Sequence, residues 1–476
     1  MSDIAPSADL EVSRRKASSY ATYVFFVLFF VNLMNYLDRY ILTGGANIIA
    51  KELHFGIDGI GFLASAFLIF FTVGVLPLGA WADRAKRKDV IAICVGIWSL
   101  ATAFTALAGN FATLLASRAV LGIGEAGYGP ASGALMADYF HRARRARVSS
   151  WWAAGALIGL MFGIIIGGIV AGLYFGAWRL SFIFMGIPGL ILAFLAWRMR
   201  EPQRNQADEE AAQRDPDSYA VSEGVNALIV PKKILPQLGT LIKIKSLIVL
   251  TVMQIFAFFV LAASAVYLPT LFQQKDTFNL TSAQAAIFSG FGIAVAGVSG
   301  VVLGGYLSDY LNRRHPGARI LVCGIGFLIG APFYVLSVVV TLVLHNILLY
   351  SFFFFSTTLL LNMYVGPSIA ASQDIVPSAV RASAVGVIAF LAHILGDAFS
   401  PSLVGFLARA FDPTHGQHFI QGMAGTDLSL ALVYTCPPAL LIAGLIGIFG
   451  SRWVKSDMEA AQLAEQASKQ ELAGKA

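Results

Sequence analysis

The sequence has little charge for its length. Of its 476 residues only 13% are Asp, Glu, Lys or Arg, whereas soluble domains average about 25%. Hydrophobic residues make up 57% of the chain and the mean hydropathy is +0.72. This composition excludes a soluble enzyme. It also excludes a nucleic-acid-binding domain, which needs basic residues gathered on a water-facing surface. The chain is predicted to lie in a membrane.

Cysteine and phosphate-binding motifs are scarce as well. Cys94, Cys323 and Cys436 lie within apolar runs, and an odd, scattered set supplies neither a disulfide framework nor a C-x-x-C metal site. The sequence contains no G-x-x-x-x-G-K-S/T loop for ATP. We therefore expect no metal and no cofactor, and any driving energy has to come from an ion gradient, with the proton as the coupling ion.

Long apolar runs take the place of the missing polar segments. A membrane-crossing helix needs roughly 17–25 such residues, and the chain has twelve runs of this kind. They are residues 20–42, 56–80, 90–107, 112–135, 149–175, 180–197, 247–272, 283–307, 320–344, 347–371, 384–408 and 430–449. The predicted fold class is an all-α membrane protein with twelve transmembrane helices.

One long polar stretch, residues 198–245, divides the runs into two sets of six. We interpret it as a cytoplasmic linker between an N-terminal six-helix bundle, residues 20–197, and a C-terminal bundle, residues 246–450. Of the 33 Lys and Arg residues, 27 lie in segments that this arrangement puts on one side of the membrane. Because cationic loops stay in the cytoplasm, the N-terminus (1–19) and the C-terminal tail (451–476) are both predicted to be cytoplasmic.

A charged motif recurs in the two halves at an offset of 226 residues. GAWADRAKRK begins at Gly79 and GYLSDYLNRR begins at Gly305. Two copies in parallel orientation indicate an internal duplication. We predict that the motif's charged residues form a gate, in which an acid at a helix end pairs with a cation or a helix N-terminus in one state only. The alternative is that they merely set the topology. These residues are Asp83, Arg84, Arg87, Asp309 and Arg313.

Few ionisable residues lie within the apolar runs. Asp38 and Arg39 are in the first run and Arg118 and Glu125 in the fourth. Each costs at least about 2.5–3.5 kcal/mol at membrane depth, so such residues mark function by default. Arg118 and Glu125 are seven residues apart, which puts them on nearly the same helix face. That face is predicted to line a water-filled cavity.

The residue types suggest separate roles. Glu125 is the predicted proton-coupling residue, and Asp38 could share that role, because a carboxyl in a partly dry cavity gains and loses its proton as cations approach and leave. Arg39 offers five donors to an anionic headgroup. The alternatives are that Asp38 and Arg39 only neutralise each other and that Glu125 only packs two helices. His393 and Asp397, at i and i+4 in the eleventh run, form a possible second titrating pair or a structural pair.

Two segments resemble a known family. The loop motif at residues 79–88 is similar to the signature of the major facilitator superfamily, and NYLDRY (35–40) with RAVLGIGEAGY (118–128) resembles its Spinster family. The resemblance implies two bundles that alternate around a midplane site and move lysophospholipids or sphingosine 1-phosphate, with Asp38, Arg39 and Glu125 as functional residues. Predicted substrate contacts are Arg39, Arg118, Tyr36, Tyr128, Gln254, Asn362 and Tyr364.

A second hypothesis keeps the superfamily and changes the substrate. Asn-Tyr-x-Asp-Arg in the first run also resembles proton-coupled symporters of organic anions, such as sugar acids or aromatic acids. A receptor or a lipid scramblase would need no coupling ion, and the buried acids argue against both. The expected partners are a small lipid or organic-anion substrate and the surrounding membrane lipids, with no nucleic acid. We expect a monomer in a bacterial inner membrane.

Overall fold

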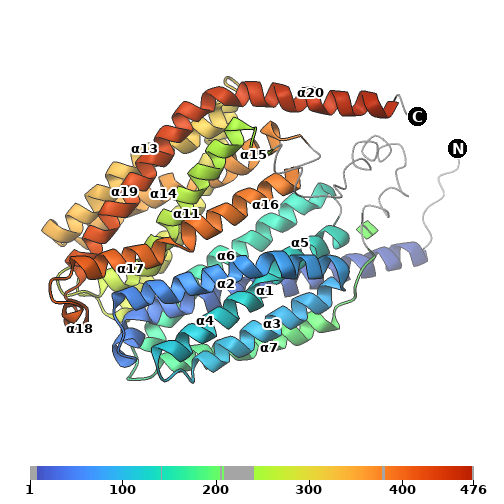
Figure 1. The fold of residues 1–476 in the computed structure, drawn as a ribbon. Coiled ribbons are helices and arrows are strands. Elements are labelled where there is room, and N and C mark those ends of the chain that lie inside the picture. The colour runs from blue at the N-terminus through green and yellow to red at the C-terminus, as the bar shows by residue number, and fades with distance from the viewer. Residues whose placement is uncertain (1–7, 141, 204–205, 208–240, 378–380, 474–476) are drawn as a thin grey trace.

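The computed structural model describes the chain apart from residues 1–7, 141, 204–205, 208–240, 378–380 and 474–476. Most of the predicted linker therefore lies outside the described residues, as do the first residues of the N-terminal segment. The described chain is helical in two groups (Figure 1). The N-terminal group comprises α1 (Ala8–Glu52), α2 (Ile57–Arg84), α3 (Arg87–Thr105), α4 (Phe111–Ala126), α5 (Tyr128–Tyr139), α6 (Arg142–Ala171) and α7 (Trp178–Arg198).

The C-terminal group contains the remaining described helices. It comprises α11 (Lys245–Phe272), α12 (Ser282–Asn312), α13 (Ala318–Val339), η1 (Val340–Leu344), α14 (Ile347–Asn362), α15 (Val365–Ile375), α16 (Arg381–Ala392), η3 (His393–Asp397), α17 (Ser400–Phe411), α18 (Gln417–Gln421) and α19 (Gly425–Gly450). A short 3-10 turn, η4 (Ser451–Trp453), leads into α20 (Val454–Ala473). The tail is therefore helical, as predicted.

Eleven helical segments within the described residues are long and apolar enough to cross a membrane. The predicted span 112–135 is divided instead, because α4 ends at Ala126 and α5 begins at Tyr128, with only Gly127 between them. Together α4 and α5 make the twelfth crossing. The first span is also longer than predicted and continues to Glu52.

The crossings define two faces of the molecule. The terminal face carries the ends of helices near residues 84–87, 139–147, 198–201, 312–319, 375–381 and 450–454, and both chain ends emerge there. The distal face carries the turns near residues 52–57, 105–111, 171–178, 272–282, 344–347 and 411–425. The positively charged loops identified from the sequence are gathered on the terminal face.

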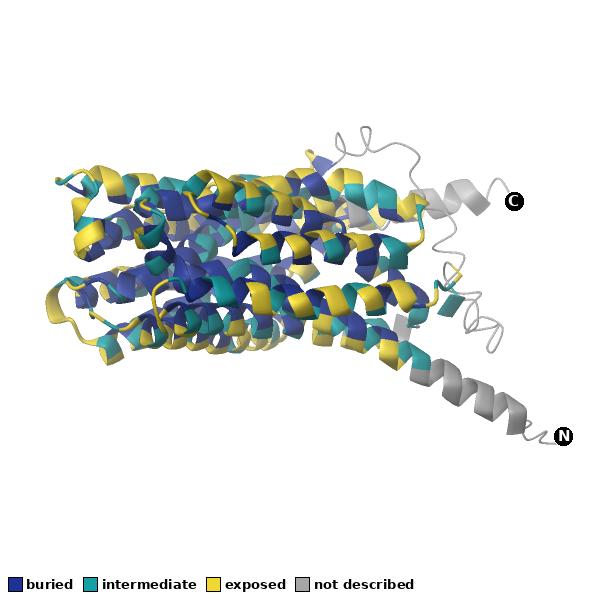
Figure 2. Ribbon diagram, turned by 90° about the horizontal axis from the view of Figure 1, so that it is seen from below, coloured by how far each residue is buried: buried dark blue, intermediate teal, exposed yellow. Residues whose placement is uncertain are grey.

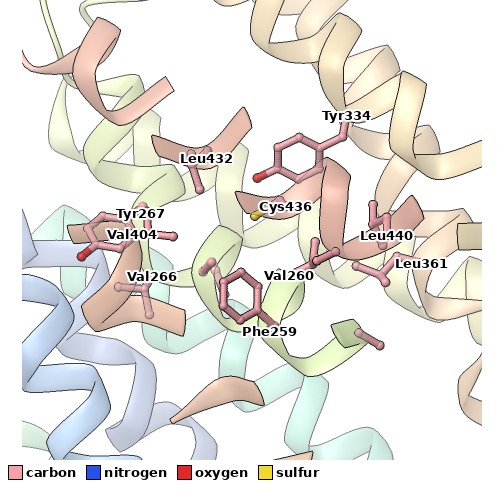
Figure 3. Packing of buried hydrophobic residues seen from close by; sticks show 14 of the residues in the cluster. Phe259, Val260, Val266, Tyr267, Tyr334, Leu361, Val404, Leu432, Cys436 and Leu440 are labelled. Carbon is pink, nitrogen blue, oxygen red and sulfur yellow. The ribbon is translucent and has the colours of Figure 1, made fainter. Parts of the chain in front are cut away.

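Apolar side chains cover both the inside and the outside of the bundles. Burial is concentrated between helices, and exposed residues follow their outer sides (Figure 2). Phe26, Val73 and Phe104 are among many large apolar residues exposed there, as expected where the surrounding solvent is lipid. Figure 3 shows the core of the C-terminal bundle, where Phe259, Val260, Leu432, Cys436 and Leu440 pack together.

A glycine ladder joins α6 to α1. Gly155, Gly159, Gly163 and Gly167 recur every four residues, and α1 runs directly over them. A Cβ added at Gly167 would lie 2.0 Å from the carbonyl oxygen of Ile41. The two backbones therefore touch, which small residues permit in membrane helices. This contact makes α1 and α6 one rigid unit of the N-terminal bundle.

The two bundles meet at the distal face. Asp58 of α2 forms a salt bridge with Arg409 of α17 at 2.6 Å, and the Ser402 backbone N–H donates to Ser65 Oγ at 3.2 Å. Asn47 donates to the Gln273 side chain at 3.5 Å, and these two positions are 226 residues apart. The repeat offset found in the sequence is thus the offset of two residues that touch across the interface. The structure is closed at its distal face.

Candidate functional site

Arg39 and Glu125 form a salt bridge inside the N-terminal bundle. Arg39 Nη2 donates to Glu125 Oε2 at 2.9 Å and joins α1 to α4. The Glu125 side chain is fully buried and that of Arg39 is 12% exposed. Arg39 Nε and Glu125 Oε1 have no hydrogen-bond partner among the described residues. The pair therefore keeps a free donor and a free acceptor, whereas a purely structural pair normally satisfies both.

Aromatic rings surround the Arg39 guanidinium. It lies 4.8 Å from the ring centroid of Tyr36, 4.8 Å from that of Phe67 and 4.9 Å from that of Phe71. The predicted contribution of Tyr36 is thus a stacking contact. Cation–π contacts of this kind contribute up to about 2 kcal/mol where water is excluded. They hold the cation in place when its carboxylate partner leaves.

A second cation and a second acid lie behind this pair. Asp38 is completely buried, and neither carboxylate oxygen has a hydrogen-bond partner among the described residues. Arg118 is 2% exposed, donates to Thr105 Oγ1 at 3.1 Å and lies over the Phe182 ring. Asp38 and Glu125 both interact electrostatically with Arg118. We call Asp38, Arg39, Arg118 and Glu125 the four-charge cluster, which is neutral overall when every member is ionised.

The local fold explains why Glu125 is placed so accurately. An Asn110 capping box starts α4, with the Asn110 side chain accepting from the Thr113 N–H at 2.9 Å. Glu125 lies in the last turn of α4, directly before the break at Gly127. Gly124 packs against the backbone of Trp98 on α3, where a Cβ would have only 2.9 Å. The close approach of α3 and α4 turns the Glu125 side chain toward α1.

The C-terminal bundle contributes one acid to this region. Asp397 lines a cavity of about 60 Å³ together with Arg39, Tyr40 and Arg118. Its carboxylate lies 2.8 Å from Nδ1 of His393, so the predicted i,i+4 pair forms. The pair lies on the π-helical turn η3, a distortion that is frequent at functional sites. The His393 ring also contacts Phe71 of α2, across the bundle interface.

The other predicted substrate contacts lie elsewhere. The Tyr128 hydroxyl donates to the Leu28 carbonyl at 2.8 Å and accepts from Trp152 at 2.9 Å, so Tyr128 ties α5 to α1 and α6. Asn362 donates to the Thr358 carbonyl, and Tyr364 is buried against Phe327. These residues, with the half-buried Gln254, are not among the residues that line the 60 Å³ cavity.

The gating motif forms a different network from the one predicted. Arg87 forms a salt bridge with Asp138 at the end of α5, and Arg319 forms salt bridges with Asp374 and, at 3.4 Å, with Asp309. Asp83, Arg84 and Arg313 are exposed. Each half thus has an Arg at the start of its third span and an Asp at the end of its fourth span.

Sequence reasoning missed Asp138, Arg319 and Asp374. Asp138 and Asp374 close their respective fourth spans, and Arg319 opens the third span of the second half. Extending the repeat beyond the glycine–aspartate motif would have found them, because these positions correspond in the two halves. Glu201 was missed as well, and its carboxylate accepts from the backbone N–H groups of Arg87 and Lys88, at 2.9 and 3.0 Å. It caps the start of α3.

A histidine and two acids at the distal face could together hold a metal ion. His418 Nδ1 lies 2.9 Å from Asp427 and 3.3 Å from Asp412. The hydrogen bond to Asp427 raises the pKa of His418. Burial raises the pKa of Asp412, but hydrogen bonds from Thr414 and Gly416 outweigh it and lower that pKa. The arrangement suits a protonated imidazole that anchors α18, and we assign it no metal.

The comparisons with known proteins agree with this architecture. A model of the Major Facilitator Superfamily matches residues 28–401. Protein spinster of Drosophila melanogaster is 28% identical over 81% of this chain, and the match spans 61% of that protein. Protein spinster homolog 1 of Xenopus tropicalis is 26% identical over 92% of this chain and 82% of its own length. The sphingosine-1-phosphate transporter SPNS2 of Danio rerio is 24% identical over 88% and 82%.

Solved structures show the same fold. A bacterial homolog to the human lysosomal transporter Spinster, in an inward-facing and unoccupied conformation, gives a TM-score of 0.79 at 24% identity and covers 92% of this chain and 98% of that chain. The nucleoside transporter NupG gives a TM-score of 0.64 at 13% identity, over 90% and 99%. Since the family model covers most of a chain that also folds into two bundles of six crossings, this protein belongs to the Major Facilitator Superfamily and is a multi-pass membrane transporter, not an enzyme.

Proposed function

We propose that this protein is a proton-coupled secondary transporter that moves single-tailed lipids with an anionic or zwitterionic headgroup, such as lysophospholipids or sphingosine 1-phosphate, by alternating access. The Arg39–Glu125 salt bridge carries the proposal, because it joins a cation suited to a headgroup to an acid suited to a proton. The similarity to Spinster proteins and to a sphingosine-1-phosphate transporter supports the substrate class.

Competition for Arg39 would couple the two cargoes. The guanidinium binds carboxylates and phosphates with the same planar donors, so an arriving headgroup displaces Glu125. The released carboxylate lies at a fully buried position, where an unpaired charge is unfavourable, and it takes up a proton. When the headgroup leaves on the other side, Glu125 loses that proton and returns to Arg39. One proton then moves with each substrate molecule.

The remaining cluster members would support this exchange. Asp38 and Arg118 keep the site electrostatically balanced while Glu125 changes its protonation. Asp397, with His393 beside it, brings a second acid from the other bundle to the cavity. The cavity of about 60 Å³ is smaller than the roughly 300–1,000 Å³ of ordinary ligand pockets. Substrate binding therefore requires the bundles to move apart next to Arg39.

The network at the terminal face would stabilise one state. Asp83, Arg84, Arg87, Asp309 and Arg313 lie where the bundles separate or approach during alternation, and the Arg87–Asp138 and Arg319–Asp374 pairs brace each copy of the motif. The concentration of cations on the terminal face supports a cytoplasmic position for both termini. A bacterial inner membrane is the location that we propose.

Uptake into proteoliposomes tests the proposal and its alternative. The purified chain is reconstituted, and uptake of a lysophospholipid is compared with uptake of a sugar acid, each with and without a pH gradient. Gradient-stimulated uptake of the lysolipid alone supports the lipid transporter. Gradient-stimulated uptake of the sugar acid alone supports an organic-anion symporter. Lysolipid movement that ignores the gradient would refute the proton coupling.

A further inference from the structure

A second and larger cavity opens at the distal face. Its volume is about 680 Å³, within the usual range for ligand sites. It shares no lining residue with the small cavity beside Arg39. One wall is formed by the end of α1 and the start of α2, and the other by the end of α17, the following loop and α18. Both bundles therefore contribute to it.

The floor of this distal cavity is aromatic and aliphatic. The Phe55 and Phe111 rings lie 5.2 Å apart, and Phe419 of the other bundle is buried beside the cavity. Phe62 and Ile420 also line it and are 46% and 69% exposed. Apolar side chains left exposed together in a concave site favour an apolar ligand. An alkyl chain fits this surface.

The rim of the cavity has an excess of positive charge. Its two acids are already engaged, because Asp58 binds Arg409 and Asp412 accepts hydrogen bonds from its own loop. Lys51 is exposed and forms no salt bridge with a described residue. Its nearest ionic neighbour from the other bundle is Lys275, which is also a cation. A negatively charged group at Lys51 would remove this repulsion between the bundles.

We propose that the distal cavity binds a single-chain anionic amphiphile, with its alkyl chain on the phenylalanine floor and its anionic group at Lys51, and that the bound molecule holds the distal face closed. The second half of the inference rests on the alternating access of the proposed function. Separation of the bundles would pull Phe55 and Lys51 away from Phe419 and destroy the cavity. A ligand that needs both walls stabilises the state that has both.

Binding is measured first, on the full chain in phosphatidylcholine nanodiscs with radiolabelled dodecyl phosphate. Empty nanodiscs correct for partition into lipid. We expect saturable binding that Lys51→Gln weakens about tenfold, the effect of one lost charge contact. Ile420→Trp should also weaken it by filling the cavity. Lys455→Gln, a matched change at an exposed residue of α20, and Arg39→Gln should leave the distal affinity unchanged.

Closure is measured next, through the reactivity of a cysteine at the bundle interface. Ser65→Cys places a thiol where the closed distal face buries it, and a hydrophilic maleimide reacts only when that face opens. Saturating dodecyl phosphate should slow the reaction at least about tenfold, whereas dodecanol and inorganic phosphate should not. Reaction of the chain without this substitution gives the background rate.

Several results would overturn the inference. Unchanged binding in both Lys51→Gln and Ile420→Trp would remove the distal cavity as the site. Loss of all binding in Arg39→Gln would place the amphiphile at the four-charge cluster alone. A maleimide rate that dodecyl phosphate does not lower would refute the locking of the distal face. None of these assays measures transport, so a failure to carry lysolipids would refute the proposed function and leave the binding result standing.

Discussion

At the scale of single residues, the four-charge cluster relates each side chain to a distinct task. Arg39 remains fixed by three aromatic rings, whereas Glu125 depends on Arg39 for its one hydrogen bond. Asp38 has no hydrogen bond to a described residue although it is completely buried. A site with unsatisfied buried charges is costly to maintain, which favours function over packing as the reason for these residues.

Replacement of Glu125 by Gln keeps the shape of the side chain and removes its charge and its proton. We expect the stimulation of lysolipid uptake by a pH gradient to fall at least about tenfold, because proton transfer groups typically contribute that much or more. Glu459→Gln on the exposed face of α20 is the matched control. Thermal unfolding verifies that both variants fold. A Glu125→Gln variant that still follows the gradient would remove this acid from the mechanism.

His418 should make stability depend on pH. Its hydrogen bond to Asp427 raises its pKa above the ordinary value of 6.5, so its charged form stabilises the folded state. That stabilisation is complete below pH 6.5 and is lost as the pH rises through the raised pKa. We expect the melting temperature to fall across this interval, and to fall less in His418→Gln. Equal slopes for both proteins would argue against the ion pair.

At the scale of helices, the packing of α6 decides which parts move together. One side of α6 carries the glycine ladder against α1, and its outer half contacts α12 through Gly168, where a Cβ would lie 2.3 Å from that of Ala286. The first contact lies within a bundle and the second lies between bundles. Alternation therefore has to break the α6–α12 contact while the α1–α6 contact stays intact.

Gly167→Ala should damage the α1–α6 contact. The added methyl group would lie 2.0 Å from the Ile41 carbonyl oxygen, and overpacking of this kind costs typically about 1–3 kcal/mol. Gly96→Ala in α3 is the control, because a Cβ there meets nothing within 4 Å, and alanine is the better helix former. We expect a lower melting temperature for the first variant and an unchanged or higher one for the second.

The sequence predicted more of the elements than of their interruptions. Apolar runs located the twelve crossings, because burial in lipid imposes length and composition on each. The break at Gly127 and the π-turn at His393 were not predicted, because they depend on contacts with neighbouring helices. Arg39, Glu125, His393 and Asp397 were identified by their charge alone. Their pairing across helices, and the structural role of Tyr128, needed the coordinates.

At the scale of the whole molecule, the distal closure combines a few polar contacts with close backbone packing. A Cβ at Gly61 of α2 would lie 2.2 Å from the Pro401 carbonyl oxygen of α17. The Tyr267 hydroxyl donates to that same carbonyl at 2.8 Å. The Asp58–Arg409 salt bridge lies nearby, and the Arg409 side chain is 56% exposed. Each contact is modest, so the closed state can be left without unfolding either bundle.

Removal of the Asp58–Arg409 salt bridge should open the distal face more often. Exposed pairs contribute about 0.2–1 kcal/mol, so Asp58→Asn should raise the maleimide reaction rate of Ser65→Cys by up to about fivefold. Exchange of the charges in Asp58→Arg with Arg409→Asp should bring the rate back toward that of the parent. A rate that stays high in the exchanged protein would show that the residues act separately.

The hydrogen bond between Asn47 and Gln273 has an evolutionary consequence. If the halves arose by duplication, an ancestor with six crossings would have paired with a second copy of itself, and one side chain would have met its own counterpart on the symmetry axis. Asn and Gln differ by a single methylene, so the fused descendant has kept that meeting almost unchanged. Swapping the two amides between their positions should therefore preserve the contact, as the lost symmetry would demand.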